Sequence, residues 1–221
     1  MFSFIKRFRF EVLLLLAFTI IFCFALWLLR FAFTGSLLYI FLNWNLFLAI
    51  LPCYFSSYIV THQGTINRYT FFLLAITWLL FFPNSPYILT DLFHLHERGG
   101  MPKWFDLIMI LSYAWAGLLF GFISLFQMES ILMTKFKPKL AKGVIIALLF
   151  ASGFGVYLGR FLRWNSWDVL SNPFALGADI GDRFIHPFSH GRTWGVTLLM
   201  GTLLTFIYFS VQVLKRSIKK S

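Results

Sequence analysis

The sequence predicts an all-α integral membrane protein: a bundle of about six transmembrane helices with a short amphipathic or re-entrant helix on its extracytoplasmic face. Two observations lead to this fold class. Of the 221 residues, 59% are hydrophobic and only 12% are charged, and apolar runs of about 20 residues recur along the chain. Because these runs are continuous rather than alternating, a β-barrel is not expected. We expect a single membrane domain over residues 1–221.

Six apolar runs define the expected spans, which are approximately 12–33, 36–60, 69–82, 105–133, 141–162 and 193–214. The first run follows three basic residues and resembles a signal peptide, but its length and the lack of a small-residue cleavage site favour a retained span. The third run has about 14 residues, whereas a crossing needs roughly 17–25. It is expected to continue through Pro83 with a kink or to begin near Asn67, and a re-entrant segment within 83–98 remains an alternative.

The distribution of basic residues predicts the orientation. Six spans place both termini on one side, together with 12 of the 19 lysines and arginines, so the positive-inside rule makes that side cytoplasmic. The lysine clusters there are expected to attract anionic lipids. Nucleic acid is not an expected partner, because the basic residues are divided among short loops. The sequence indicates no protein partner.

Most of the ionisable residues fall on the opposite, extracytoplasmic side. It contains the two long connections, 83–104 and 163–192, and four of the five histidines. With Asp106 at its edge, it also holds six of the eight acidic residues. Polar side chains of the spans also fall mainly in the outer halves, at Asn43, Asn45, Thr77, Ser112, Tyr113, Tyr157 and Arg160. They have either a functional role or a role in interhelical hydrogen bonding. Glu129, near the inner end of the fourth span, is assigned no role.

The two cysteines have two interpretations. Cys23 and Cys53 both lie inside apolar runs. A metal or redox pair is one reading, but small apolar packing is the expected role.

The first motif is the stretch FPNSPYILTDLFHLHERGG at 82–100. Asn84 or Ser85 can cap a helix over 86–98, and the two glycines can end it. Helical periodicity places Tyr87, Asp91, His94 and Arg98 on one side and apolar residues on the other. The motif therefore predicts an amphipathic helix at the membrane surface, about 20 Å long and too short to cross.

The second motif is GFGVYLGRFLRWNSWD at 153–168. Gly155 and Gly159 form a GxxxG pattern, which allows another helix to approach closely. Arg160 and Arg163 lie at the outer end of the fifth span. Two guanidiniums one turn apart suit a carboxylate or phosphate. The alternative is arginines that snorkel to the interface beside tryptophans that fix the depth of the helix.

A third, weaker pattern lies at 178–190. Asp182, His186 and His190 follow each other at i, i+4 spacing, which would align metal ligands on a helix. Pro187 interrupts such a helix, so a solvated loop is the alternative. No familiar hydrolase, nucleotide or zinc motif occurs, and the sequence therefore identifies no metal or cofactor.

The stretches NSPYILTDLFHL and GVYLGRFLRWNSWD are similar to a bacterial membrane-protein family called domain of unknown function 1361, over nearly the whole chain. The resemblance implies a multi-pass protein of a bacterial cell (plasma) membrane and supplies no activity. The positions that match its motifs are Asn84, Pro86, Tyr87, Asp91, His94, Arg160, Arg163, Asn165, Trp167 and Asp168.

Two functions follow from these patterns. One is a membrane-embedded hydrolase or transferase acting on a lipid-linked or anionic substrate, with Asp91 and His94 as catalytic residues. The substrate-binding candidates are then Arg160, Arg163, Asn84, Tyr87, Asn165 and Asp168. The other is a non-enzymatic scaffold or partner-binding protein. A transporter is less favoured, since no polar trail crosses the spans. We also expect Asp91 to pair with Arg160 or Arg163.

Overall fold

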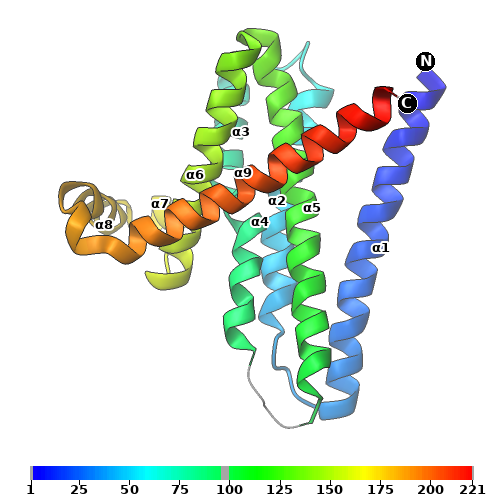
Figure 1. The fold of residues 1–221 in the computed structure, drawn as a ribbon, viewed down its shortest axis with the longest axis vertical. Helices are drawn as coiled ribbons and strands as arrows, with labels where there is room; N and C mark the ends of the chain where they lie inside the picture. Colours follow the sequence, from blue (N-terminus) through cyan, green and yellow to red (C-terminus); the bar gives the residue numbers. More distant parts are fainter. Residues whose placement is uncertain (1, 96–99, 221) are drawn as a thin grey trace. The chain divides into compact units, whose positions relative to one another are not determined.

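The computed structural model describes residues 2–95 and 100–220, and in these residues the chain is helical with short turns (Figure 1). Six helices are long and apolar enough to cross a membrane, which confirms the predicted fold class. They cover Phe10–Thr34, Phe41–Thr61, Arg68–His94, Lys103–Lys135, Pro138–Phe161 and Pro187–Ser217.

The helices follow one another in a simple order. They are α1 (Phe2–Thr34), α2 (Phe41–Thr61), α3 (Arg68–Phe81), α4 (Asn84–Tyr87), the 3₁₀-helix η1 (Ile88–His94), α5 (Lys103–Lys135), α6 (Pro138–Phe161), α7 (Asp168–Ser171), α8 (Pro173–Ile185), the 3₁₀-helix η2 (Pro187–His190) and α9 (Gly191–Lys220). The chain divides into two compact units, unit 1 (1–124) and unit 2 (125–221), and the boundary falls inside α5. The single domain expected from the sequence stays a prediction.

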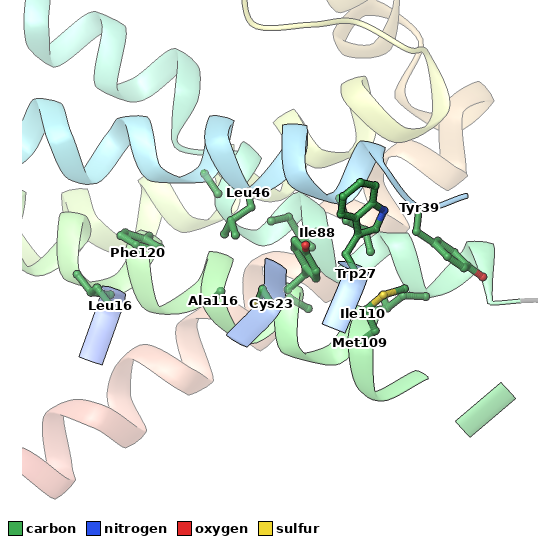
Figure 2. Packing of buried hydrophobic residues seen from close by; sticks show 14 of the residues in the cluster. Leu16, Cys23, Trp27, Tyr39, Leu46, Ile88, Met109, Ile110, Ala116 and Phe120 are labelled. Carbon is green, nitrogen blue, oxygen red and sulfur yellow. The ribbon is translucent and has the colours of Figure 1, made fainter. Parts of the chain in front are cut away.

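The core of unit 1 is built by α1, α2, η1 and the first part of α5 (Figure 2). Its buried residues include Cys23 of α1, Leu46 of α2, Ile88 of η1 and Ala116 of α5. Cys53 belongs to the same cluster, so both cysteines pack as apolar side chains. The outward sides of these helices remain apolar, because their surroundings in a membrane are hydrocarbon rather than water.

The third span is a broken helix. The helical path of α3 continues through α4 and η1, so this span has 27 residues instead of the 14 of the apolar run. The continuation past Pro83 is thus confirmed. Proline interrupts the ladder of backbone hydrogen bonds, and a neighbouring side chain compensates: Asn84 Nδ2 donates to the carbonyl of Phe81 at 2.9 Å.

The outer-surface position expected for the helix over 86–98 stays a prediction, and the described part of this segment packs into unit 1. Thr90 and Asp91 are only 5% and 1% exposed, while Phe93 is 62% exposed. Both sides of the segment therefore contribute to the interior, because the apolar Ile88 is also fully buried, while His94 on the polar side is exposed. The buried Asp91 finds its hydrogen-bond partner inside the bundle. Residues 96–98 lie outside the described residues.

Two glycines of α5 allow the broken segment to enter unit 1. A Cβ atom on Gly117 would lie 2.7 Å from the carbonyl oxygen of Ser85, and one on Gly121 would lie 2.7 Å from the Ser85 Cβ. Ser85 is fully buried there, and its hydroxyl donates to the carbonyl of Ala49 in α2 at 3.2 Å. Small residues therefore let α4 pack directly against the backbones of two spans.

In unit 2, α6 packs closely against α9. A Cβ atom on Gly153 would lie 2.8 Å from the carbonyl oxygen of Thr197. Gly153 thus lets α9 approach α6 closely, whereas the close-approach role expected for Gly155 and Gly159 stays a prediction. Helix α8 is the amphipathic helix of unit 2: Leu176 is buried, whereas Phe174 is 91% and Ile185 is 72% exposed.

Replacing Gly117 with alanine is expected to lower the free energy of unfolding by about 1–3 kcal/mol, because a backbone atom would have to move to admit the methyl group. The matched control is Gly143→Ala, at a helical position with no atom within 4 Å of the added Cβ. It should be neutral or raise the unfolding free energy by up to about 1 kcal/mol. Thermal unfolding in detergent, followed by tryptophan fluorescence, measures both. Equal melting temperatures for the two variants would contradict this packing.

Candidate functional site

Asp91 is a buried carboxylate in η1. It is 1% exposed, and its Oδ2 accepts a hydrogen bond of 2.8 Å from the amide of Asn45 in α2. The preceding Thr90 donates to the carbonyl of Tyr87 at 2.6 Å, which tightens the start of the 3₁₀ segment. An ionisable residue inside a membrane span is costly to bury and marks a candidate functional position.

His94 lies one 3₁₀ turn after Asp91, and residues three apart are aligned in such a helix. Its carbonyl oxygen accepts a hydrogen bond of 3.1 Å from the hydroxyl of Tyr39. Its imidazole is exposed and lies edge-on to the ring of Phe41, with 5.3 Å between the ring centroids. One edge of η1 thus carries a buried carboxylate followed by an exposed imidazole.

A buried ion pair lies at the same end of the unit 1 spans. Arg30 of α1 donates to both carboxylate oxygens of Asp106 in α5, at 2.7 and 3.3 Å, and both side chains are 1% exposed. The guanidinium also lies over the ring of Tyr39, 4.9 Å from its centroid. Tyr39 is buried and has a left-handed backbone (φ 66°). Its ring contact with Arg30 therefore holds the turn before α2 in place.

The polar residues of the spans divide into two groups. Asn43 accepts a hydrogen bond of 2.6 Å from Tyr113, which joins α2 to α5 and supports the interhelical interpretation. Thr77 and Ser112 instead donate to carbonyls four residues earlier in their own helices, at 2.9 and 2.8 Å. These two hydroxyls therefore need no partner from another helix.

In unit 2, Arg163 stands just past the end of α6 in a left-handed conformation (φ 63°). Its side chain is exposed and makes no hydrogen bond, ion pair or ring contact with the described residues. Two further guanidiniums lie near the same end of α6. Arg160 is half-buried in the last turn of α6, and Arg192 of α9 lies over the ring of Phe161, 5.5 Å from its centroid.

Asp168 organises the turn that follows. Its Oδ2 accepts the backbone N–H of Asn165 at 2.6 Å and the Asn165 side-chain amide at 3.2 Å, and its Oδ1 accepts the hydroxyl of Ser171 at 2.9 Å. The backbone N–H of Asn165, followed by the Ser171 hydroxyl, holds the pKa of Asp168 below its usual value. These contacts give Asn165 and Asp168 a local structural role beside the arginines.

A second acidic residue of unit 2, Asp182, contacts both histidines of the pattern at 178–190. Asp182 Oδ1 lies 2.9 Å from His186 Nδ1, and its Oδ2 lies 2.7 Å from His190 Nε2. The hydrogen bonds from His186 and then His190 hold the pKa of Asp182 below its usual value. Pro187 does end α8, as predicted, but the turn of η2 brings His190 back to the carboxylate.

The sequence analysis missed the role of Glu129. It is 4% exposed in unit 2, and its Oε1 accepts a hydrogen bond of 2.6 Å from the hydroxyl of Tyr208. Gln212 donates to both carboxylate oxygens, at 3.1 and 3.0 Å. The i, i+4 spacing of Tyr208 and Gln212 on one face of the last span was the available signal.

The structure brings some of the predicted site residues together and leaves others apart. Asp91 and His94 share η1, whereas Arg160 and Arg163 belong to unit 2, so the predicted pairing of Asp91 with either arginine stays a prediction. Asn84 contacts the carbonyl of Phe81, and no described residues form a group of three or more metal-ligating side chains.

Six apolar helices with ionisable residues held inside them define a multi-pass membrane protein. A comparison with protein families matches residues 44–207 to one described as "Protein of unknown function (DUF1361)", and the chain belongs to this family. This confirms the resemblance found in the two motifs. Comparisons with curated proteins and with solved structures find no match.

The Arg30–Asp106 pair yields a test of the unit 1 packing. Arg30→Met is expected to lower the free energy of unfolding by about 3–5 kcal/mol, because it leaves a buried carboxylate without its cation. The double variant Arg30→Met, Asp106→Leu should lose less free energy of unfolding than Arg30→Met alone. The free energies of unfolding of the unchanged protein, the single variant and the double variant are measured in mixed micelles by increasing the dodecyl sulfate concentration. The control is Arg68→Met, whose guanidinium lies over the exposed ring of Phe72, and it should cost under about 1 kcal/mol. A double variant that loses as much free energy of unfolding as Arg30→Met alone, or more, would contradict the coupling.

Proposed function

We propose that this protein is a membrane-embedded hydrolase or transferase that binds a phosphate- or carboxylate-bearing lipid at the extracytoplasmic face. In unit 2, Arg163 and Arg160 are the proposed anion-binding residues, and in unit 1, Asp91 and His94 are the proposed acid–base residues. The protein resides in a bacterial plasma membrane with both termini in the cytoplasm, an orientation supported by the 12 of 19 basic residues on that side.

The observation that carries the anion-binding part is the exposed guanidinium of Arg163, which makes no polar contact with the described residues. A non-glycine residue with a left-handed backbone costs about 1–2 kcal/mol, which glycine would avoid. The backbone N–H of Trp164, which donates to the carbonyl of Leu158 at 3.1 Å, repays this cost by closing the end of α6. The support for anion binding therefore comes from the exposed guanidinium and not from backbone strain. The planar guanidinium donates paired hydrogen bonds to a phosphate or carboxylate. Arg160 and Arg192 add positive charge at the same end of α6.

The catalytic part is supported by the contrast between Asp91 and His94. The carboxylate is buried and accepts a hydrogen bond from Asn45, whereas the imidazole next to it along η1 is exposed. Histidine is the side chain best suited to exchange protons near neutral pH. In this proposal His94 exchanges the proton with the substrate, and Asp91 is the buried carboxyl group one turn before it.

A scaffold is the second candidate, and one observation favours it. The polar side chains of the unit 1 spans pair with each other across helices, as Arg30 does with Asp106 and Asn43 with Tyr113. Such pairing is what a purely structural network requires. The two experiments below separate the candidates, because a scaffold needs neither a lipid-binding arginine nor an acid–base residue.

Arg163→Gly is expected to raise the free energy of unfolding by about 1 kcal/mol, because glycine adopts the left-handed conformation without strain. The same change should weaken binding of a polyprenyl monophosphate at least tenfold, since it removes a charged donor worth about 1.5–3 kcal/mol. Native mass spectrometry of the purified protein measures binding, with phosphatidylcholine as the zwitterionic comparison lipid.

Arg163→Lys should retain part of the affinity, because it keeps the charge and loses the paired donors. The charge control is Lys103→Gln, at an exposed position of unit 1. A glycine variant that is stabilised and binds the lipid like the unchanged protein would contradict the anion-binding role.

Asp91→Asn and His94→Ala are each expected to reduce lipid turnover at least 100-fold, the usual contribution of a general acid or base. Proteoliposomes that contain a polyprenyl diphosphate and phosphatidylglycerol provide the assay, and mass spectrometry follows the lipid products. Ser112→Ala, which removes only a hydroxyl bonded within its own helix, should match the unchanged protein. If the unchanged protein converts neither lipid and Asp91→Asn only lowers the melting temperature, the scaffold is the better description.

A further inference from the structure

One side of helix α8 is exposed and carries no charged residue. Phe174, Phe184 and Ile185 are exposed there, and Gly177 and Ala178 are exposed on the same side. Helical periodicity makes these positions one continuous surface rather than scattered residues. An exposed apolar surface of this kind marks a place where the protein contacts an apolar partner.

A second side of α8 packs into unit 2 and fixes the rotation of the helix about its axis. Leu176 and Arg183, two helical turns apart, are both buried. Asp179 accepts a hydrogen bond of 2.7 Å from the indole N–H of Trp164, which lies just past the end of α6. Because these residues hold the second side against the unit, the apolar side stays exposed.

The third side of α8 is polar. Asp182 lies there, 2.9 Å from His186 and 2.7 Å from His190, and the side chains of Asp182 and His186 are 46% and 60% exposed. Charged and polar groups of this kind need water or lipid headgroups around them. A helix that carries an apolar side next to a polar side is typical of the boundary between the headgroups and the acyl chains of a bilayer.

The chain that follows α8 leads directly to a surface that faces hydrocarbon. The 3₁₀-helix η2 joins α8 to α9, and its Phe188 is fully exposed. Leu199 and Phe206 are exposed along α9, which is long and apolar enough to cross a membrane. Side chains on the outside of a span contact acyl chains. The same bilayer therefore begins where α8 ends, and its acyl chains are the partner that the apolar side of α8 requires.

We propose that α8 is an interfacial helix in the leaflet in which α6 ends. Its apolar side, with Phe174 and Ile185, lies among the acyl chains, and Asp182 lies at the level of the headgroups. The helix has 13 residues and a length of about 20 Å, so it cannot cross a hydrocarbon core of about 30 Å. Much of the connection between α6 and α9 is therefore embedded in lipid instead of forming a solvated loop. This inference depends neither on the proposed lipid chemistry nor on which side of the membrane is cytoplasmic.

Spin labels on the full-length protein in phosphatidylcholine vesicles test the proposal. Gly177→Cys and Ala178→Cys place a label on the apolar side without removing a large side chain, and a Cβ on Gly177 meets no atom within 4 Å. Leu199→Cys, on the exposed side of α9, is the reference for hydrocarbon, and Lys139→Cys, exposed in the first turn of α6, is the reference for water. The two native cysteines are buried, so the unchanged protein gives the background signal.

Power saturation with oxygen, which dissolves in lipid, and with a water-soluble nickel chelate on both sides of the membrane measures the depth of each label. The labels at Gly177 and Ala178 should collide with oxygen and lie about 5–10 Å below the lipid phosphates. Collision with the nickel chelate at either position, to the extent seen at Lys139, would overturn the proposal. Labels screened from both reagents would also overturn it, because they would show a protein on this side, and spin–spin broadening would identify that protein as a second copy of the chain.

Discussion

A polar side chain inside a membrane protein can find its partner only on another part of the same protein, because hydrocarbon offers no hydrogen bonds. The Arg30–Asp106 pair shows this constraint most clearly, because both charged side chains are almost fully buried in unit 1. Asn45 with Asp91 follows the same rule in unit 1, and Glu129 with Tyr208 follows it in unit 2. Each pair joins two spans, so each fixes how one helix is rotated and placed against the next.

The spans could be predicted from the sequence, because hydropathy and length determine them. Which polar residues point into the bundle could not be predicted. Periodicity predicts an amphipathic helix over 86–98 with its polar side toward water. In the structure, Asp91 of that side is buried, while His94 of the same side and Phe93 of the apolar side are exposed. Periodicity gives the two sides of a helix without saying which medium lies beyond each, and only the neighbouring spans decide that. Glu129 escaped notice for a related reason, as its partner Tyr208 is 79 residues away.

The polar groups of this protein fall into two physical classes. Those of the spans, such as Asn43 and Glu129, are bonded within the protein and contribute to the packing. The exposed Arg163 lies where α6 ends, and its guanidinium leaves donor capacity for a ligand from outside this chain. Its charge and planar geometry suit an anion.

The break in the third span also bears on how the chain enters the membrane. Residues 68–81 form an apolar helix that partitions into lipid, but α4 and η1 carry Asn84 and Asp91, whose burial depends on Asn45 and on the glycines of α5. During synthesis α2 is already present when this segment emerges, whereas α5 is still to be made. The second half of the third span therefore has to wait near the membrane surface or within the insertion machinery until the fourth span arrives. Its insertion is thus a cooperative step of two spans rather than an independent event for each helix.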